Sequence, residues 1–454
     1  MLKLWLFADT HLYFRGPTRE EALEPGEKQK LESGPILDAA LADFLAAPDC
    51  DTLLIAGDVT CNGHADEHRL LIEKLRRVQA AGKRIVLITA THDFGGHENM
   101  GKVNESGLPP LEHPEGKVFR PDLRGLYDEF GFRDAIARFD GDGGMSYVAQ
   151  LAPGYRLLCL NDDGDGRAFC GYYEPHMQWI LEQVEQARAD GEVLFGMGHH
   201  PSLPPSPIYP LISSRDMLGD WKDATRRFAD AGLRVMFTGH SHMLNIADLT
   251  TPDGNQYWDV NTSSLPGWPG VFRVIELEGR HMKVTTRAIE DFDWDRGGLS
   301  VREHLARHFD YLLRTIIESA ANDLEKLAKH AGGFSVEKET IYKFRLPITV
   351  AGKFINKVTL GGMGALLLCR RKVPKDVRKQ SMKELMLELM RNVWAGEEHY
   401  SPETPVGQSL LAFAARAQCF LKKKLAGGPM ENLPAFLLSL IYDPTPDDHL
   451  EIEL

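Results

Sequence analysis

LKLWLFADTH, residues 2–11, is an apolar run of strand length that stops at an aspartate and a histidine. Four later apolar runs stop in the same way, at AGDVT (56–60), ATHDF (90–94), GHHP (198–201) and TGHSH (238–242). One buried strand that ends on a metal-capable side chain is ordinary. Five of them within the first 242 residues predict a single site at one sheet edge, because the carboxyl ends of parallel strands meet there.

Around these motifs, strand-length apolar runs alternate with helix-length amphipathic stretches up to about residue 290. Strands are predicted over residues 2–8, 52–57, 84–90, 156–161, 193–198, 234–239, 256–261, 271–277 and 282–289. Helices are predicted over residues 36–47, 66–81, 174–189 and 215–231. This alternation predicts a buried, largely parallel sheet with helices outside it. The last predicted strands lack helices between them, so we expect that end to be antiparallel.

Two segments depart from this alternation. Residues 94–146 are rich in glycine, proline and charge, and their place directly after a motif favours a lid or cap insert over a disordered segment. After a linker at residues 291–300, amphipathic segments follow at 300–330, 335–350, 376–395, 407–425 and 433–441. We therefore expect a first domain over residues 1–295 and an all-helical C-terminal domain over residues 299–454.

The overall composition limits the kinds of partner and the cellular compartment that we expect for the chain. The formal net charge of −13 offers no global attraction to a phosphate backbone, so a nucleic-acid polymer is not the expected partner. The six cysteines are scattered, which suits free thiols in a reducing compartment. No basic leader or long apolar run is present, so we expect a cytoplasmic chain without a membrane partner.

The motif side chains form a set of oxygen and imidazole donors without a thiolate: Asp9, Asp58, His11, His199, His240 and His242. Such a set suits Mn, Fe or Zn better than Ca or Mg. Two divalent ions bridged by one carboxylate would carry a charge of +4, and Asp9 and Asp58 would contribute −2. A surplus charge of about +2 would then remain to hold hydroxide and phosphate. This is the electrostatic requirement of phosphoester hydrolysis. His92 is the predicted proton donor for the leaving oxygen, and Asp93 beside it is predicted to fix its orientation.

In order and spacing, these residues resemble the calcineurin-like metallophosphoesterases, whose pattern is D-x-H, G-D, G-N-H-D/E, a histidine after a strand, and G-H-x-H. The resemblance covers about residues 1–290 and implies a four-layer α/β/β/α sandwich as the fold of the catalytic domain, within an α/β class. It implies that Asp9, His11, Asp58 and His242 bind a first metal. Asp58, His199 and His240 are implied as ligands of a second metal, with Asp58 bridging.

One position departs from the family pattern. Thr91 stands where the family has an asparagine that binds the second metal, and Ala90 stands where it has glycine. A hydroxyl is shorter and a weaker donor than an amide carbonyl. Three alternatives follow: Thr91 binds the metal directly, a water fills the gap, or the chain has lost strong catalysis.

The predicted activity is the hydrolysis of a small phosphoester by a metal-bridging hydroxide, with a phosphodiester preferred. The insert and the helical extension resemble bacterial cyclic-nucleotide phosphodiesterases that carry a C-terminal helical extension. A phosphomonoesterase or a nuclease is an alternative on the same site. A metal-binding regulatory protein with weakened catalysis, which holds a partner with its helical domain, is the alternative from another class.

Most other polar residues are predicted to be solvated or not to bind metal. Asn161-Asp162-Asp163 is predicted to be a solvated turn, with a contact to the site as the alternative. His200 is predicted not to bind metal, with a contact to the site or the substrate as the alternative. Four residues of the insert are expected to be solvated: His97, His113, Arg120 and Arg124. The basic clusters at residues 370–372 and 422–424 read as solvated helix ends rather than nucleic-acid sites.

Overall fold

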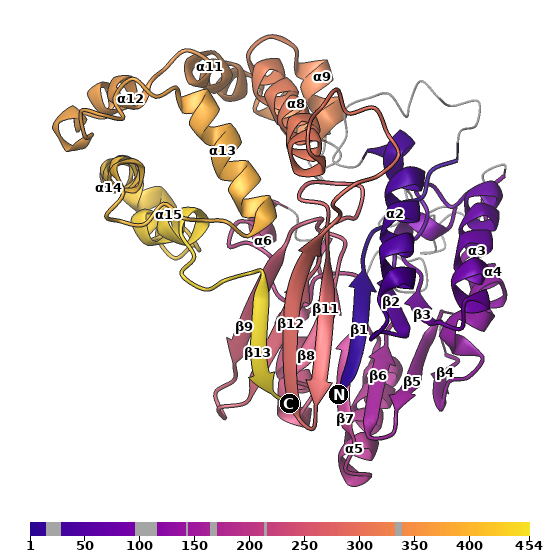
Figure 1. Ribbon diagram of the computed structural model, residues 1–454. Helices are drawn as coiled ribbons and strands as arrows, with labels where there is room; N and C mark the ends of the chain where they lie inside the picture. The colour runs from indigo at the N-terminus through magenta and orange to yellow at the C-terminus, as the bar shows by residue number, and fades with distance from the viewer. Residues whose placement is uncertain (15–28, 96–115, 142–143, 164–169, 213–215, 332–337) are drawn as a thin grey trace, which may run out of the picture.

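Two β-sheets pack face to face with helices on their outer faces, and a helical C-terminal part extends to one side (Figure 1). The computed structural model describes residues 1–14, 29–95, 116–141, 144–163, 170–212, 216–331 and 338–454. Within these ranges, no helix is both long and apolar enough to cross a bilayer.

The first sheet has six strands in the order β13 (His449–Glu453), β12 (His281–Ala288), β11 (Val271–Glu278), β1 (Leu2–Phe7), β2 (Thr52–Ala56) and β3 (Arg84–Ile88). Strands β1, β2 and β3 are parallel, whereas β11 to β13 are antiparallel. Strand β2 and the second half of β1 are buried on both faces, as expected for strands covered by layers on each side.

The second sheet has seven strands in the order β4 (Ala137–Phe139), β5 (Ser146–Ala152), β6 (Tyr155–Cys159), β7 (Val193–Met197), β8 (Val235–Thr238), β10 (Gln256–Asn261) and β9 (Asn245–Thr250). Strands β6, β7, β8 and β10 are parallel, and β4, β5 and β9 pair in antiparallel fashion at the two edges.

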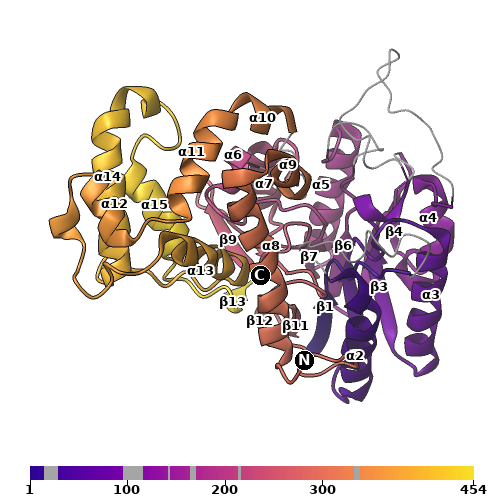
Figure 2. The ribbon, with the colours of Figure 1, turned by 90° about the horizontal axis from the view of Figure 1, so that it is seen from above.

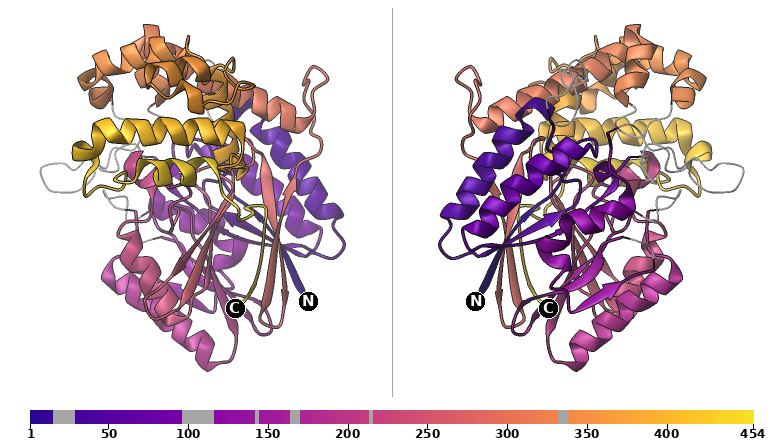
Figure 3. Two further views of the ribbon diagram at one scale, coloured as in Figure 1. Left: turned by 90° about the vertical axis from the view of Figure 1, so that its left-hand side faces the viewer. Right: turned by 90° about the vertical axis from the view of Figure 1, so that its right-hand side faces the viewer.

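Helices cover the outer face of each sheet. Helices α2 (Ser33–Ala46) and α3 (Ala65–Ala80) pack on the first sheet, and α5 (Glu174–Ala189) and α7 (Trp221–Ala231) pack on the second. Figure 3 shows the two helical layers on opposite sides of the sheets. The layers therefore stack as helix, sheet, sheet, helix, and the predicted α/β/β/α sandwich is confirmed.

All nine predicted strands occur, and their antiparallel end is confirmed. Four strands were not predicted: β4, β5, β9 and β13. Strands β9 and β13 alternate between exposed and partly buried residues and lie at sheet edges. An edge strand needs few apolar residues because one side of it meets solvent, so its sequence signal is weak.

Eight helices make up the described C-terminal part: α8 (Val301–Asn322), α9 (Leu324–Ala331), α10 (Lys338–Lys343), α11 (Arg345–Ile355), α12 (Leu360–Leu366), α13 (Met382–Ala395), α14 (Pro405–Leu425) and α15 (Leu433–Ile441). The segment predicted over 300–330 is split at Asp323, whose carboxylate accepts the backbone N–H of Lys326 at 3.0 Å and so starts a new helix. Helix α12 was missed because three of the seven residues in its sequence, LGGMGAL, are glycines, which disfavour a helix.

The expectation that residues 299–454 are entirely helical is wrong at the end of the chain. Strand β13 returns to the first sheet and pairs with β12. Phe309 of α8 and Trp394 of α13 join the main core, whereas α12, α14 and α15 surround a small core of their own (Figure 2). The division at residues 295 and 299 stays a prediction.

Part of the predicted insert is built into the body of the protein. Its described residues form α4 (Arg120–Tyr127), the π turn η4 (Asp128–Phe132) and β4. Leu123, Tyr127 and Phe130 join the main core. Residues 96–115, with His97 and His113, lie outside the described residues, so the lid function stays a prediction.

Candidate metal centre

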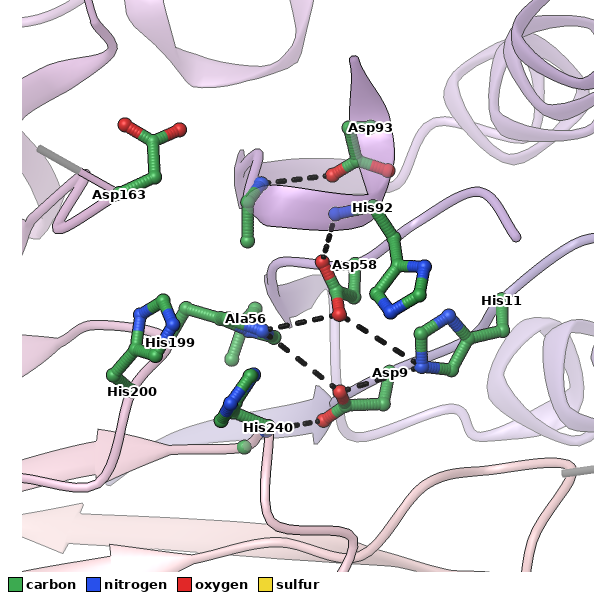
Figure 4. Close-up of polar contacts among 12 residues, drawn as sticks. Asp9, His11, Ala56, Asp58, His92, Asp93, Asp163, His199, His200 and His240 are labelled. Atoms are coloured by element: carbon green, nitrogen blue, oxygen red, sulfur yellow. Dashed lines mark hydrogen bonds and ion pairs between the residues drawn. The ribbon is translucent and has the colours of Figure 1, made fainter. Parts of the chain in front are cut away.

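The candidate site lies where strands of both sheets end (Figure 4). Asp9 follows β1, Asp58 follows β2 and the short 3-10 helix η2 (Thr91–Asp93) follows β3. From the second sheet, His199 follows β7 and His240 follows β8. All are carboxyl ends, the edge where α/β sheets bind ligands. The structure brings together the six predicted aspartate and histidine ligands: Asp9, His11, Asp58, His199, His240 and His242.

Most of these residues have a left-handed backbone conformation. The φ angle is 50° at Asp9, 40° at His11, 47° at Asp58, 63° at His240 and 58° at His242. Among the other described non-glycine residues, only two have a positive φ. Such a conformation costs on the order of 1–3 kcal/mol per residue and persists only where surrounding contacts hold it. The backbone is therefore bent to turn these side chains toward a common centre.

Two motif glycines leave room for the converging side chains. At Gly57, whose φ is 84°, a Cβ atom would lie 2.7 Å from Nδ1 of His199. At Gly239, a Cβ atom would lie 2.3 Å from Oδ2 of Asp9. Contacts this short are clashes, so the close packing around the centre requires glycine at both positions.

The first candidate metal group consists of Asp9, His11 and His242. Nε2 of His11 lies 3.1 Å from Nε2 of His242 and 3.6 Å from Oδ1 of Asp9. Nε2 of His242 lies 3.5 Å from the same oxygen. Donor atoms bound to one ion at about 2.1 Å lie roughly 3.0–3.5 Å apart, so the spacing fits a shared metal ion. Oδ2 of Asp9 accepts the backbone N–H of His240 at 2.9 Å, which leaves Oδ1 to face the group.

The second candidate metal group consists of Asp58, His199 and His240. Oδ2 of Asp58 lies 3.2 Å from Nε2 of His199 and 3.8 Å from Nε2 of His11, which belongs to the first group. Oδ1 of Asp58 accepts the backbone N–H of His92 at 2.8 Å. One oxygen of Asp58 thus faces both groups, as the bridging role predicted for this residue requires.

The surroundings of His199 show that this group fits a cation. Nδ1 of His199 lies 2.8 Å from the carbonyl oxygen of Ala56 and carries the hydrogen, since a carbonyl only accepts. Within the described residues, Nε2 of His199 and Oδ1 of Asp9 are buried without a hydrogen-bond partner. Burial lowers the pKa of His199, but the charges of Asp58 and Asp9 raise it to about 9. A metal ion would supply the favoured positive charge and displace the proton.

The pKa values of the other donor residues also favour the binding of a cation. Burial alone would raise the pKa of Asp9 and of Asp58, but the charge of His199 holds both pKa values well below the ordinary range. The pKa of His240 is pushed well below its usual value by burial and by the charge of His200. His240 therefore offers a neutral ring, the form in which histidine binds metals.

His92 lies beside the first group. Its ring sits edge-on to that of His11, with ring centroids 4.9 Å apart. Nδ1 of His92 lies 2.9 Å from the carbonyl oxygen of Cys61 and carries the hydrogen for the same reason as at His199. Nε2 is then the nitrogen that can exchange a proton with a substrate, which agrees with the role predicted for His92.

Asp93 supports the loop that carries His92. Its carboxylate accepts the backbone N–H of Ala90 at 2.8 Å, and the N–H and O–H of Thr60 at 2.8 and 2.9 Å. Burial and the charge of Asp58 raise the pKa of Asp93 to about 7. These bonds join the loops after β2 and β3 and hold the backbone on both sides of His92, and the orienting role of Asp93 stays a prediction.

Thr91, the departure from the family pattern, begins η2 and is 8% exposed. Its hydroxyl forms no hydrogen bond within the described residues. It is therefore available to a metal ion or to a water.

The sequence profile described as calcineurin-like phosphoesterase matches residues 2–244, more than half of the chain and all six candidate ligands. The chain belongs to the calcineurin-like phosphoesterase family. Among curated proteins, no sequence matches the chain.

Several solved structures are similar to this phosphoesterase. A dimetal phosphatase from Danio rerio shares 13% identity with a TM-score of 0.47, over 66% of this chain and 98% of that one. A putative 5'-nucleotidase from Staphylococcus aureus shares 11% identity with a TM-score of 0.37, over 68% and 58%. A phosphopantetheinyl hydrolase from Mycobacterium tuberculosis shares 17% identity with a TM-score of 0.30, over 57% and 89%.

Sequence reasoning missed the burial of Asp162 beside the candidate metal centre of this phosphoesterase. The expected solvated turn at residues 161–163 is wrong, because Asp162 is 1% exposed. Its Oδ2 accepts the backbone N–H groups of His199 and His200 at 2.9 and 2.8 Å, and its Oδ1 lies 2.8 Å from Nδ1 of His200. The His200 ring lies 4.2 Å, centroid to centroid, from that of His240. Asp162 thus braces the second group. The overlooked signal was its strand-end position after β6, next to β7.

Arg120 was also predicted to be solvated, and this is wrong. It is 8% exposed and donates from Nε to Asp163 at 2.7 Å and from Nη2 to the side-chain oxygen of Asn161 at 2.8 Å. Asn161 in turn donates to the carbonyl oxygen of Thr89, just after β3, at 2.8 Å. This network fastens α4 to the sheet edge that carries the site. Arg124 is half-buried: its guanidinium lies 4.5 Å from the centroid of the Phe132 ring and pairs with the exposed Asp140.

Proposed function

We propose that the protein hydrolyses a phosphodiester bond in a small substrate, with two ions of Mn, Fe or Zn bound by the two groups. The single observation that supports this most strongly is the arrangement around Oδ2 of Asp58, which lies 3.2 Å from His199 and 3.8 Å from His11. A carboxylate between two histidine-rich groups suits a dinuclear centre. Two bound ions would supply a hydroxide nucleophile and neutralise the phosphate charge.

The residues of the chain would carry out the other steps. Asp9 and Asp58 would remain ionised and hold the positive charge in place. His92 in its imidazolium form, with a hydrogen on both ring nitrogens, would donate the Nε2 proton to the leaving oxygen while its Nδ1–H stays bound to the carbonyl of Cys61, and the ring would be left neutral. The backbone bond from His92 to Asp58 would keep the donor at a fixed place relative to the centre.

The preference for a diester rests on the resemblance to bacterial cyclic-nucleotide phosphodiesterases with an insert and a helical extension. A phosphomonoesterase or a nuclease would use the same residues. The scattered free cysteines support a cytoplasmic location. A regulatory metal protein with weak catalysis is the second candidate, and the observation that favours it is Thr91 at the position of a family ligand.

The test uses the purified full chain loaded with Mn, Fe or Zn. Metal content and the hydrolysis of an aryl phosphodiester and the matching monoester are measured for the wild type and for His92→Ala. We expect diester hydrolysis with kcat about 100-fold lower or more in His92→Ala and with unchanged metal content. Bound metal with no hydrolysis of either ester would favour the regulatory protein. Faster hydrolysis of the monoester would overturn the diester preference.

A further inference from the structure

An exposed surface at the end of the helical part combines large apolar side chains with basic ones. We name it the apolar-basic patch. Its apolar members are Leu366, Leu368, Phe420 and Leu421, which are 60%, 76%, 67% and 38% exposed. Its basic members are also exposed and are Arg370, Arg371, Lys372, Lys422, Lys423 and Lys424.

The two halves of the patch are adjacent. One half lies at the end of α12 and in the 3-10 turn η7 (Arg370–Lys372), and the other lies on the last turns of α14. Arg416 of α14 donates to the carbonyl oxygen of Leu367 at 3.1 Å. Below the surface, Cys369 and Val373 share a buried cluster with Phe413 of α14. Figures 1 and 2 show α12 and α14 side by side, at the end of the molecule farthest from α3 and α4.

This part of the chain has the opposite charge to the rest. Residues 338–425 contain 17 Lys and Arg against seven Asp and Glu, a net charge of +10 in a chain whose total is −13. Residues 366–379 and 416–424 together contain ten basic residues and one acidic residue, Asp376. The patch is thus the exposed face of a strongly basic segment, and it would attract an anionic surface while the rest of the protein is repelled.

The conformation of Leu368 is unusual as well. It has a φ of 55°, and it is the only apolar residue among the described non-glycine residues with a positive φ. The other such residues are Asp220 and the five of the metal centre. A leucine in this conformation is strained, yet 76% of its surface stays exposed.

We propose that the apolar-basic patch binds an anionic lipid surface, with Leu366, Leu368 and Phe420 inserted between headgroups and the basic residues against lipid phosphates. Apolar side chains among lysines and arginines are typical of peripheral membrane contacts, where apolar burial and charge attraction add. Lysine is depleted in protein–protein interfaces, which argues against a protein partner. Phe420 is the only aromatic member, which argues against a nucleic-acid stacking surface.

The proposal goes beyond the proposed function and does not depend on it. It also departs from the sequence-based expectation of no membrane partner, because a peripheral contact needs no spanning segment. The sequence reading of residues 370–372 and 422–424 as solvated helix ends did not take into account the exposed leucines beside them.

The test is flotation of the purified full chain with vesicles of phosphatidylcholine alone or with about one-third phosphatidylglycerol. We expect binding only to the anionic vesicles, weakened by added salt. The variant Lys422→Ala/Lys423→Ala/Lys424→Ala should bind about 100-fold more weakly, and Leu368→Ser about tenfold more weakly. Because these side chains are exposed, circular dichroism and the metal content should match those of the wild type.

Matched controls separate the patch from general charge and apolar effects. Arg69→Ala/Arg76→Ala/Arg77→Ala removes three exposed charges from α3, and Ile136→Ser removes a side chain that is 50% exposed. Both should bind vesicles like the wild type. Equal binding of wild type and the lysine variant, or no binding to anionic vesicles at low salt, would overturn the proposal. Binding of single-stranded RNA but not of vesicles, lost in the lysine variant, would also overturn it and indicate a nucleic-acid surface.

Discussion

The two halves of the metal centre are built differently. The second group is braced from outside: Ala56 and Asp162 hold His199, and the ring of His200 packs against His240. In the first group, Oδ2 of Asp9 accepts the backbone N–H of His240 at 2.9 Å, and Nδ1 of His11 lies 3.3 Å from the carbonyl oxygen of Thr60. The family resemblance implies that Thr91 replaces an asparagine ligand of the second ion. Support of the donors and a full set of donors are separate properties, so we expect the second ion to bind more weakly although Ala56 and Asp162 hold His199.

The largest loss of hydrolysis is expected from a change at Asp58, which faces both metal groups. Asp58→Asn removes the charge that faces both groups, so hydrolysis should fall by about 1,000-fold, equivalent to about 4 kcal/mol of transition-state stabilisation. Activity assays and metal analysis of the purified variant measure this. Asp49→Asn, at an exposed carboxylate paired with Lys3, serves as the control and should be unaffected. Activity equal to that of the wild type in Asp58→Asn would mean that hydrolysis does not use this centre.

The second prediction compares the number of metal ions that each group retains when one of its histidines is removed. His240→Ala should leave about one ion per chain, because the first group stays intact. His242→Ala should leave less than one, because only the weaker group remains. Each should lower hydrolysis by about 100-fold. Titration with zinc, followed by metal analysis, measures the stoichiometry. The expected order of affinity would be refuted by identical metal contents in the two variants.

A third effect concerns the protein after metal removal by a chelator. The pKa of His199 is raised from 6.5 to about 9. Its stabilising contribution is complete below about pH 6.5 and is lost as the pH rises through about 9. We expect the metal-free protein to lose on the order of 2 kcal/mol between these values. Urea unfolding at several pH values measures this, with His199→Gln as the control in which the loss should be smaller by about this amount. A flat profile in the wild type would show that the second half carries no such charge.

A smaller effect is expected from the bracing of the second group. Asp162→Asn keeps the shape but weakens the bonds to His199 and His200, so the affinity for the second ion should fall about tenfold while the first is unchanged. Isothermal titration with Mn or Zn measures both affinities. Asp190→Asn, at an exposed carboxylate, is the matched control. If both ions were weakened equally, Asp162 would support the whole edge rather than one half.

The smallest effect is expected at Thr91. Thr91→Asn restores the family donor, so the second ion should bind a few-fold more tightly and diester hydrolysis at low metal concentration should rise. Thr91→Val, which has a similar shape without the hydroxyl, tests the opposite direction. No change in either variant would mean that a water already completes the second site.

The ligands could be predicted because each lies in a short local motif. Asp9 with His11, Gly57 with Asp58, and His240 with His242 are recognisable within a few residues, and their strand-end positions imply convergence. Asp162 also follows a strand, but neither its burial nor that of Arg120 could be predicted, because neighbouring residues do not reveal burial. Asp162 is buried because β6 lies beside β7, and Arg120 because α4 packs against the same edge.

The sequence by itself determined the layered α/β architecture, the donor set of the metal centre and the helical character of the C-terminal part. These follow from apolar periodicity and from residue chemistry, which are local properties of the chain. Only the tertiary structure decided that one oxygen of Asp58 faces both groups, that Asp162 braces the second, and that β13 closes the first sheet. It also decided that Leu368 and Phe420 lie among basic residues on one surface. Each of these depends on contacts between distant segments, which form only when the chain packs.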